Sequence, residues 1–166
     1  GLKKFNYFIL TLHRPSNVDN LNKFYKILKT IAKYTKNFPI VFCVHPRNKE
    51  NIKNLPSIPK SILFVEAQPY LEFNYLVSFS KGVITDSGGI TEETTVLGIP
   101  CITLRDTTER PETIKIGTNV LIGNNIENIK AELNKIFSNK WKKGSIPKYW
   151  DGKTGSRIVK ILENVI

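Results

Sequence analysis

The sequence is poor in the residues and patterns that staple very small domains or span membranes. It has two cysteines and two histidines in 166 residues, and no apolar run approaches the roughly 18 residues that a membrane-spanning helix needs. Its start has neither the apolar stretch nor the small-residue cleavage site of a signal peptide. We therefore expect no membrane association and a cytoplasmic location.

Both cysteines, Cys43 and Cys101, stand in short apolar runs, where a small buried hydrophobic side chain is the ordinary occupant. Their spacing matches no zinc-binding pattern, and two histidines in unrelated segments do not complete one. We expect inert core thiols and no bound metal.

Acidic residues are scarce relative to basic ones, which gives a formal net charge of +11. A basic surface can indicate nucleic-acid binding, but here 20 of the 25 basic residues are lysines scattered through helical segments. We therefore expect no nucleic-acid partner. The five arginines are more informative, because a planar guanidinium suits phosphate or carboxylate better than an ammonium does. They are Arg14, Arg47, Arg105, Arg110 and Arg157.

The length fits one domain, and short apolar runs alternate with amphipathic stretches along it. Strands are predicted at 5–12, 39–44, 62–65, 83–85, 101–104 and 119–122. Helices are predicted at 19–37, with Asn17 or Asp19 as cap, and at 70–80, 90–97, 111–116, 126–137 and 156–165. This alternation predicts an α/β fold, a Rossmann-like parallel sheet with helices on both faces.

Polar side chains follow the predicted strands at the point where each one ends. In an open parallel sheet, ligands bind beyond these carboxyl ends. Both histidines, His13 and His45, stand there, and either could transfer a proton or hold a phosphate oxygen. A purely structural role for each is the alternative.

The turn from Asp86 to Gly89 is the sharpest local feature. Paired glycines let backbone N–H groups approach a ligand, and the N-terminus of the following helix attracts negative charge, so a diphosphate would suit Ser87, Gly88 and Gly89. An ordinary strand-to-helix turn capped by Asp86 or Ser87 explains the same residues.

Two acidic residues, Glu92 and Glu93, begin the helix after this turn. Complementarity to the helix dipole accounts for one of them. A carboxylate can also accept both hydrogens of a ribose diol, a role that we assign to Glu93, leaving Glu92 to solvent or packing. Phe73 would by default be core, but its ring could instead stack on a base. The charged stretch 105–112 is either a solvated loop or an anion clamp.

Several of these motifs together resemble one known family, the non-hydrolysing UDP-N-acetylglucosamine 2-epimerases. The motifs are Thr11-Leu-His-Arg, His45-Pro-Arg, Asp86-Ser-Gly-Gly-Ile-Thr-Glu-Glu, Leu97-Gly-Ile-Pro, Arg105-Asp-Thr-Thr-Glu-Arg-Pro-Glu and Asp151-Gly-Lys-Thr-Gly-Ser-Arg-Ile. The likeness covers essentially the whole chain, and the string beginning at Arg105 is highly specific.

The resemblance implies the GT-B architecture, in which two Rossmann-like domains face each other across a cleft. Residues 1–166 would be the C-terminal, UDP-binding domain, without the N-terminal domain that supplies most catalytic carboxylates. The family interconverts UDP-N-acetylglucosamine and UDP-N-acetylmannosamine by eliminating and re-adding UDP. It uses no added cofactor and usually works as a homodimer.

The resemblance also implies roles for individual residues. Ser87, Gly88 and Gly89 would hold the diphosphate, Glu93 the ribose and Phe73 the uracil, with His13 at the reacting sugar and Arg110 near the phosphates. Arg14, His45 and Arg47 are possible contacts to substrate or to a second, allosteric UDP-N-acetylglucosamine.

Two departures from the family pattern are Pro15-Ser16 after the His-Arg pair and Tyr149-Trp150 before Asp151. The first puts regulation by substrate in doubt. Three alternatives stay open: a hydrolysing epimerase, a glycosyltransferase donor domain, and a nucleotide-sugar-binding module without chemistry of its own.

Overall fold

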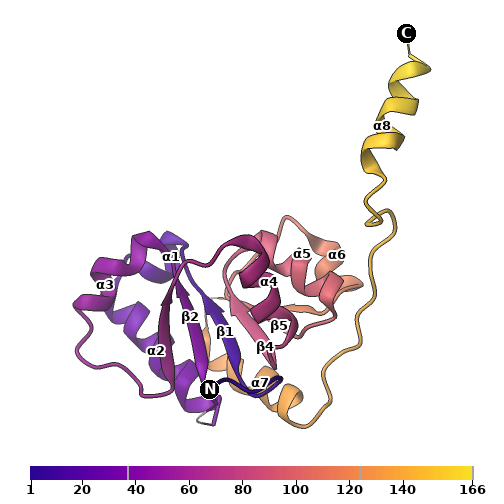
Figure 1. The fold of residues 1–166 in the computed structure, drawn as a ribbon. Coiled ribbons are helices and arrows are strands. Elements are labelled where there is room, and N and C mark those ends of the chain that lie inside the picture. Colours follow the sequence, from indigo (N-terminus) through magenta and orange to yellow (C-terminus); the bar gives the residue numbers. More distant parts are fainter. Residues whose placement is uncertain (37, 124, 166) are drawn as a thin grey trace.

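The computed structural model describes residues 1–36, 38–123 and 125–165, and within them six parallel strands form one sheet in the order β3-β2-β1-β4-β5-β6 (Figure 1). The strands are β1 (Phe8–Thr11), β2 (Ile40–Val44), β3 (Ile62–Glu66), β4 (Gly82–Thr85), β5 (Cys101–Thr103) and β6 (Asn119–Leu121). The predicted Rossmann-like parallel sheet is confirmed.

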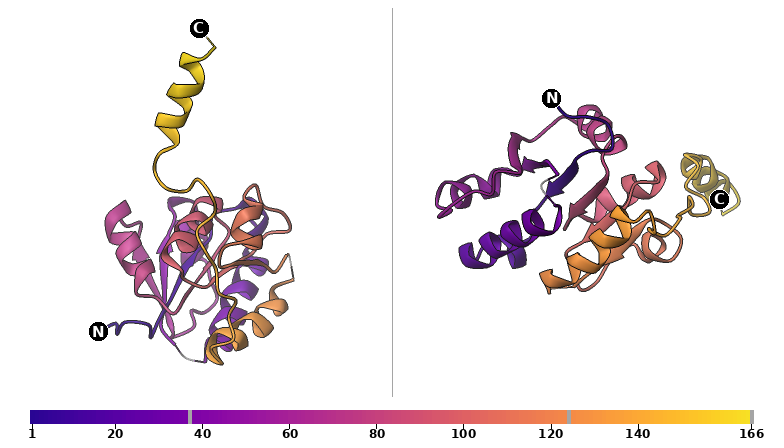
Figure 2. Two further views of the ribbon diagram at one scale, coloured as in Figure 1. Left: turned by 90° about the vertical axis from the view of Figure 1, so that its right-hand side faces the viewer. Right: turned by 90° about the horizontal axis from the view of Figure 1, so that it is seen from below.

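Helices cover both faces of the sheet (Figure 2). They are α1 (Pro15–Val18), α2 (Leu21–Tyr34), α3 (Lys49–Lys53), α4 (Tyr70–Ser78), α5 (Gly88–Leu97), α6 (Pro111–Lys115), α7 (Ile129–Phe137) and α8 (Thr154–Glu163), with 3-10 turns η1 (Pro46–Asn48) and η2 (Ile126–Asn128). Each predicted strand and helix has a counterpart among these elements. The short α1 and α3 were not predicted.

Side chains that alternate along the buried strands form two separate cores, one on each face of the sheet. Phe8 and Leu10 of β1 point into the core under α2 and α7, whereas Ile9 points into the core under α4 and α5. Successive side chains of a strand face opposite sides of the sheet, so one strand serves both layers. Cys43 and Cys101 belong to the second core, and burial raises the pKa of each thiol to about 11.

The N-terminus of α2 differs from the prediction. Its cap is Asn20, whose side chain accepts a hydrogen bond from the Lys23 amide at 2.9 Å. Asn17 is instead buried in α1, and Asp19 pairs with Arg47. The predicted cap was wrong because α1 inserts a helical turn before α2. Position 37, the predicted end of this helix, lies outside the described residues.

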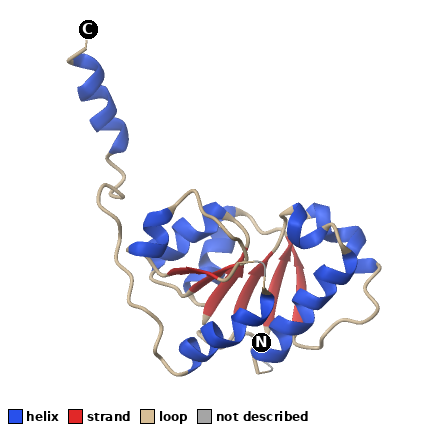
Figure 3. Ribbon diagram, turned by 180° about the vertical axis from the view of Figure 1, so that it is seen from behind, coloured by secondary structure: helices blue, strands red, loops and turns tan. Residues whose placement is uncertain are grey.

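The C-terminal helix α8 stands away from the rest of the molecule, at the end of an extended segment that follows α7 (Figures 1 and 3). Its apolar side chains Ile158, Ile161, Leu162 and the following Val165 recur at helical spacing and are all exposed. In the described part of the chain, no helix is long and apolar enough to cross a membrane.

Candidate functional site

The candidate site lies where the strand order reverses, at the carboxyl ends of β1 and β4. Thr11 and Thr85 are register partners on these strands, and their hydroxyl oxygens are 2.6 Å apart. The two chain segments therefore leave the sheet side by side, which brings His13 to Asp86 across 73 positions of sequence. Crevices at such reversal points are the usual ligand sites of open α/β sheets.

Asp86 is completely buried and is held by several donors. Its carboxylate accepts hydrogen bonds from the backbone amides of His13, at 3.1 and 3.2 Å, and of Arg14, at 2.9 Å. The Asn17 side chain donates a further bond at 3.1 Å. Burial raises the pKa of Asp86, but these bonds and the His13 imidazole outweigh it and leave the pKa below its usual value.

The two imidazoles of the chain lie together at this edge. His13 Nδ1 is 3.0 Å from Asp86 Oδ1, and the His13 side chain is 35% exposed. The His45 ring has its centroid 5.6 Å from that of His13. His45 Nδ1 accepts a hydrogen bond from the Arg47 amide at 3.2 Å. The placement of both histidines at one site, expected from the strand ends, is confirmed.

The glycine turn begins α5 and leaves space at its N-terminus. Ser87 occupies the cap position, but its side chain makes no capping hydrogen bond to any residue that the structure describes. Within the described ranges, a Cβ at Gly89 would meet no atom within 4 Å. Since the first-turn amides of a helix have no intrahelical partner, this opening can accept an anion. Asp86 is not the cap, because its carboxylate is bound to the loop after β1.

A pocket of about 480 Å³ adjoins the turn. Polar side chains line it together with apolar ones: Thr11, Leu12, His13, Cys43, His45, Ala67, Gln68, Tyr70, Phe73, Ser87 and Ile90. Two aromatic rings, two imidazoles and the start of α5 thus share one cavity. In the described part of the chain its lining does not include Gly88, Gly89, Glu93, Arg110, Arg14 or Arg47.

Glu93 is hydrogen-bonded to Tyr70, a residue of this cavity that the sequence analysis did not identify. The Tyr70 hydroxyl, at the start of α4, donates a hydrogen bond to Glu93 Oε1 at 2.8 Å. This bond raises the pKa of Tyr70. Tyr70 and Phe73 both line the pocket, so α4 presents two aromatic rings beside the carboxylate of α5.

Arg105 and Glu109 of the 105–112 loop pair with each other. Arg105 makes two hydrogen bonds to Glu109, at 2.8 and 2.6 Å, and lowers the pKa of Glu109 to about 2. A Cβ on Gly88 would lie 3.7 Å from Arg105 Nη1. Arg105 therefore lies beside the glycine turn. Arg110 near the phosphates was implied by the family resemblance and stays a prediction.

Arg110 is bound to Glu92, with its Nε 2.6 Å from Glu92 Oε1. Glu92 thus has an ion-pair partner that the sequence did not predict. Arg47 is likewise paired, through two nitrogens, with Asp19. Arg14 differs, because its Nε is buried and has no hydrogen-bond partner within the described ranges.

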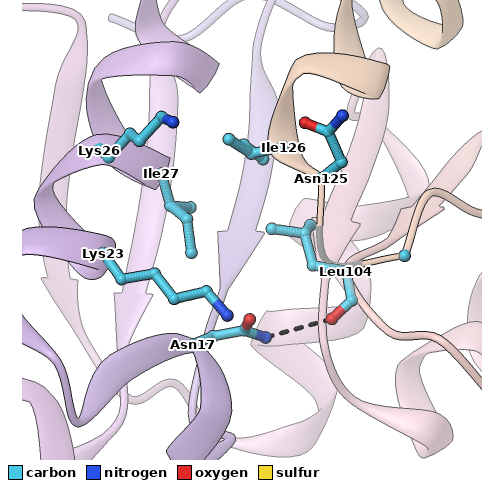
Figure 4. A pocket seen from close by; sticks show the side chains of 8 residues that line it. Asn17, Lys23, Lys26, Ile27, Leu104, Asn125 and Ile126 are labelled. Carbon is cyan, nitrogen blue, oxygen red and sulfur yellow. Dashed lines mark hydrogen bonds between the residues drawn. The ribbon is translucent and has the colours of Figure 1, made fainter.

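Asn17 belongs to the Asp86 network and also to a second, smaller pocket. Its amide nitrogen donates to the Leu104 carbonyl at 3.1 Å, as Figure 4 shows. This pocket, of about 170 Å³, is lined by Lys23 and Lys26 of α2 and by Ile126, among others. Sequence reasoning missed Asn17 because its partners lie 69 and 87 positions away.

Metal-binding groups are not found in the described part of the chain: no three of its His, Cys, Asp and Glu side chains are arranged to hold an ion.

Comparison with known proteins gives one consistent family. The family model described as UDP-N-acetylglucosamine 2-epimerase matches residues 2–163. A UDP-N-acetylglucosamine 2-epimerase of Methanocaldococcus jannaschii is 41% identical over 164 residues, which cover 95% of this chain and 44% of that protein. An Escherichia coli K12 protein of the same name is 34% identical, with 82% of this chain and 38% of that protein covered.

Solved structures agree with the sequence matches. The M. jannaschii UDP-GlcNAc 2-epimerase in complex with UDP-GlcNAc and UDP is similar with a TM-score of 0.80 at 39% identity, covering 95% of this chain and 45% of that one. An E. coli heptosyltransferase bound to ADP, at 17% identity and a TM-score of 0.52, shares the fold alone. The chain spans about half the length of the relatives it matches and corresponds to the C-terminal half of the GT-B fold.

Proposed function

This chain belongs to the UDP-N-acetylglucosamine 2-epimerase family, and on that premise we propose that residues 1–166 form the UDP-binding domain of an enzyme that interconverts UDP-N-acetylglucosamine and UDP-N-acetylmannosamine. A second domain, outside this chain, supplies the remaining catalytic groups. The assembled enzyme is a cytoplasmic homodimer in this proposal.

The observation that carries the proposal is the open glycine turn at the start of α5, beside a cavity lined by an aromatic ring. Ser87, Gly88 and Gly89 hold the diphosphate through the Ser87 hydroxyl and the backbone amides at the start of α5, because a helix N-terminus stabilises negative charge. The Ser87 amide itself donates to Thr85 Oγ1. Phe73 stacks on the uracil. Glu93, next to Tyr70, accepts the ribose hydroxyls.

The sugar end of the ligand then lies toward the loops after β1 and β2. His13 is placed at the reacting sugar, where it can accept or donate a proton. Arg14, whose Nε has no hydrogen-bond partner among the described residues, and His45 are contacts to the substrate or to a second nucleotide sugar. Arg47 and Arg110 already pair with carboxylates, Asp19 and Glu92, so they bind an anion either with their remaining N–H groups or by exchanging these partners for it.

The mechanistic task of this domain is to stabilise UDP as it leaves. Donors fixed before the reaction and aimed at the developing diphosphate charge lower the barrier of elimination, and the same donors hold UDP for re-addition. Carboxylates that act at C2 of the sugar belong to the other domain. The isolated chain therefore binds UDP without epimerising UDP-N-acetylglucosamine, and turnover by the chain alone would contradict this assignment.

Calorimetric titration with UDP tests the site. Ser87→Asp adds a negative charge where the diphosphate is proposed to dock, so we expect at least about tenfold weaker binding, or about 1.4 kcal/mol. Ser145→Asp, at an exposed position after α7, is the matched control and should leave the affinity unchanged. Equal affinity of the native chain and Ser87→Asp would place the nucleotide elsewhere.

A further inference from the structure

The two histidines of the site are held through the same ring nitrogen by opposite kinds of partner. His13 Nδ1 lies 3.0 Å from a carboxylate oxygen of Asp86, whereas His45 Nδ1 lies 3.2 Å from the backbone nitrogen of Arg47. A carboxylate can only accept a hydrogen bond, and a backbone N–H can only donate one. The two contacts therefore require opposite protonation at Nδ1.

We infer that Asp86 is a positioning residue that keeps the proton of neutral His13 on Nδ1, and that His45 is held in the opposite form with its proton on Nε2. His13 then has a free Nε2 lone pair that accepts, and His45 has an Nε2–H group that donates. Both rings line one pocket. The pocket thus contains one accepting and one donating imidazole.

Asp86 is fixed firmly enough for this role. The carboxylate is completely buried and accepts bonds from the amides of His13 and Arg14 and from the Asn17 side chain as well as from the imidazole. These donors also keep it ionised, because they lower its pKa below the usual value. A buried ionised carboxylate cannot give a proton to His13 Nδ1, so that nitrogen must carry its own.

The pair favours a ligand group that both donates and accepts hydrogen bonds, such as a sugar hydroxyl or an acetamido group. His13 Nε2 would receive the hydrogen of that group while His45 Nε2–H donates to its oxygen. This use of the pair rests on the proposed function. The protonation forms themselves do not rest on it, because contacts within the chain determine them in the absence of a ligand.

Nitrogen NMR of the histidine side chains tests the inference without any ligand. On the 166-residue chain, at a pH where both rings are neutral, we expect a protonated-type Nδ1 and an unprotonated-type Nε2 for His13, and the reverse for His45. An Nε2–H form of His13 in the native chain overturns the inference, whether or not any variant folds.

Variants separate positioning from general packing. In Asp86→Asn the side-chain amide can donate to Nδ1, so His13 should change to the Nε2–H form while His45 stays as it is. Asn17→Ala removes a bond to the same carboxylate without touching the imidazole, and should leave His13 in the native form. A native form in Asp86→Asn, or a changed form in Asn17→Ala, contradicts the role of Asp86.

UDP titration keeps this test apart from that of the proposed function. If the protonation forms are as expected but UDP does not bind the native chain, the nucleotide site is wrong and the histidine pair stands. If UDP binds and His13 has its proton on Nε2, the pair is wrong and the nucleotide site stands.

Discussion

At the scale of single residues, Asp86 joins two loops that are far apart in the sequence. It ties the chain after β1 to the turn before α5 through backbone and side-chain bonds. Removing such a buried, hydrogen-bonded charge leaves donors without a partner, at a cost of about 1–3 kcal/mol for each buried group. Asp86 should therefore contribute to the stability of the fold as well as to the protonation form of His13.

The lowered pKa of Asp86 makes its contribution to stability depend on pH. Because the folded-state pKa lies below the ordinary value of 3.8, the stabilisation is complete above that value and is lost as pH falls through the folded pKa. We expect Asp86→Asn to reduce the free energy of unfolding by about 2 kcal/mol at pH 7. The gap to the native chain should narrow when urea unfolding is repeated at successively lower pH below 3.8.

Asp151→Asn is the control for this measurement. Arg157 lowers the pKa of Asp151 to about 2, but the pair joins the segment before α8 to that helix, away from the sheet. Its loss should not change unfolding of the sheet at any of these pH values. A constant gap between the native chain and Asp86→Asn across this range would show that the pKa of Asp86 is not lowered in the folded chain.

Candidate site residues could be identified from the sequence where they stand next to a local signal, such as the end of a strand. The glycine turn, both histidines and Phe73 were identified because each stands at a strand end or on the helix beside one. Asp86 was considered only as a helix cap. Its actual partners depend on the pairing of β1 with β4, and periodicity within either strand does not reveal which strands pair. Arg105 was identified only as part of the charged stretch 105–112, because side-chain direction in a loop follows from its carboxylate partners.

At the scale of elements, α5, α6 and β6 pack closely around Gly117. A Cβ on this residue would lie 2.7 Å from the Thr113 carbonyl oxygen and against the buried Thr95 side chain. Overpacking of this kind costs about 1–3 kcal/mol. We expect Gly117→Ala to lower the free energy of unfolding by about 2 kcal/mol in urea titrations.

Gly155→Ala is the matched control, because a Cβ there meets no atom within 4 Å among the described residues. It should leave the transition midpoint where it is. An unchanged midpoint in Gly117→Ala as well would mean that the α6–β6 connection can shift to admit the added methyl group without lowering the free energy of unfolding.

Elements were predicted where apolar periodicity is long. All six strands and the helices corresponding to α2, α4, α5, α6, α7 and α8 were anticipated within a few residues. The short helices α1 and α3 span one turn or little more, which is too short for a 3.6-residue pattern to appear. The cap of α2 was misplaced for this reason, since α1 occupies the stretch in which the cap was sought.

At the scale of the whole molecule, all the apolar side chains of α8 remain exposed. Ile158, Ile161, Leu162 and Val165 form one stripe with exposed fractions between 51% and 79%. A helix of this length is marginal in water unless it packs on something. We expect it to pack on the second domain of the proposed enzyme.

A chimera tests this expectation. The chain would be joined to the part of the M. jannaschii relative that it does not match, and thermal unfolding compared with that of the chain alone. Ile161→Asp should lower the midpoint of the chimera by several degrees and leave the isolated chain unchanged. Lys160→Asp, on the same helix outside the apolar stripe, is the control. Equal midpoints for native and Ile161→Asp chimeras would show that α8 docks elsewhere.

The common direction of all six strands has a practical consequence. Every connection that enters a strand lies at the edge opposite the glycine turn, and the stretch 54–61 before β3 is one of these. A fluorescent protein inserted into that stretch would remain attached to the sheet and leave the edge that carries the glycine turn unobstructed. Given the binding proposed above, the domain would then be the sensing module of a genetically encoded reporter for nucleotide sugars.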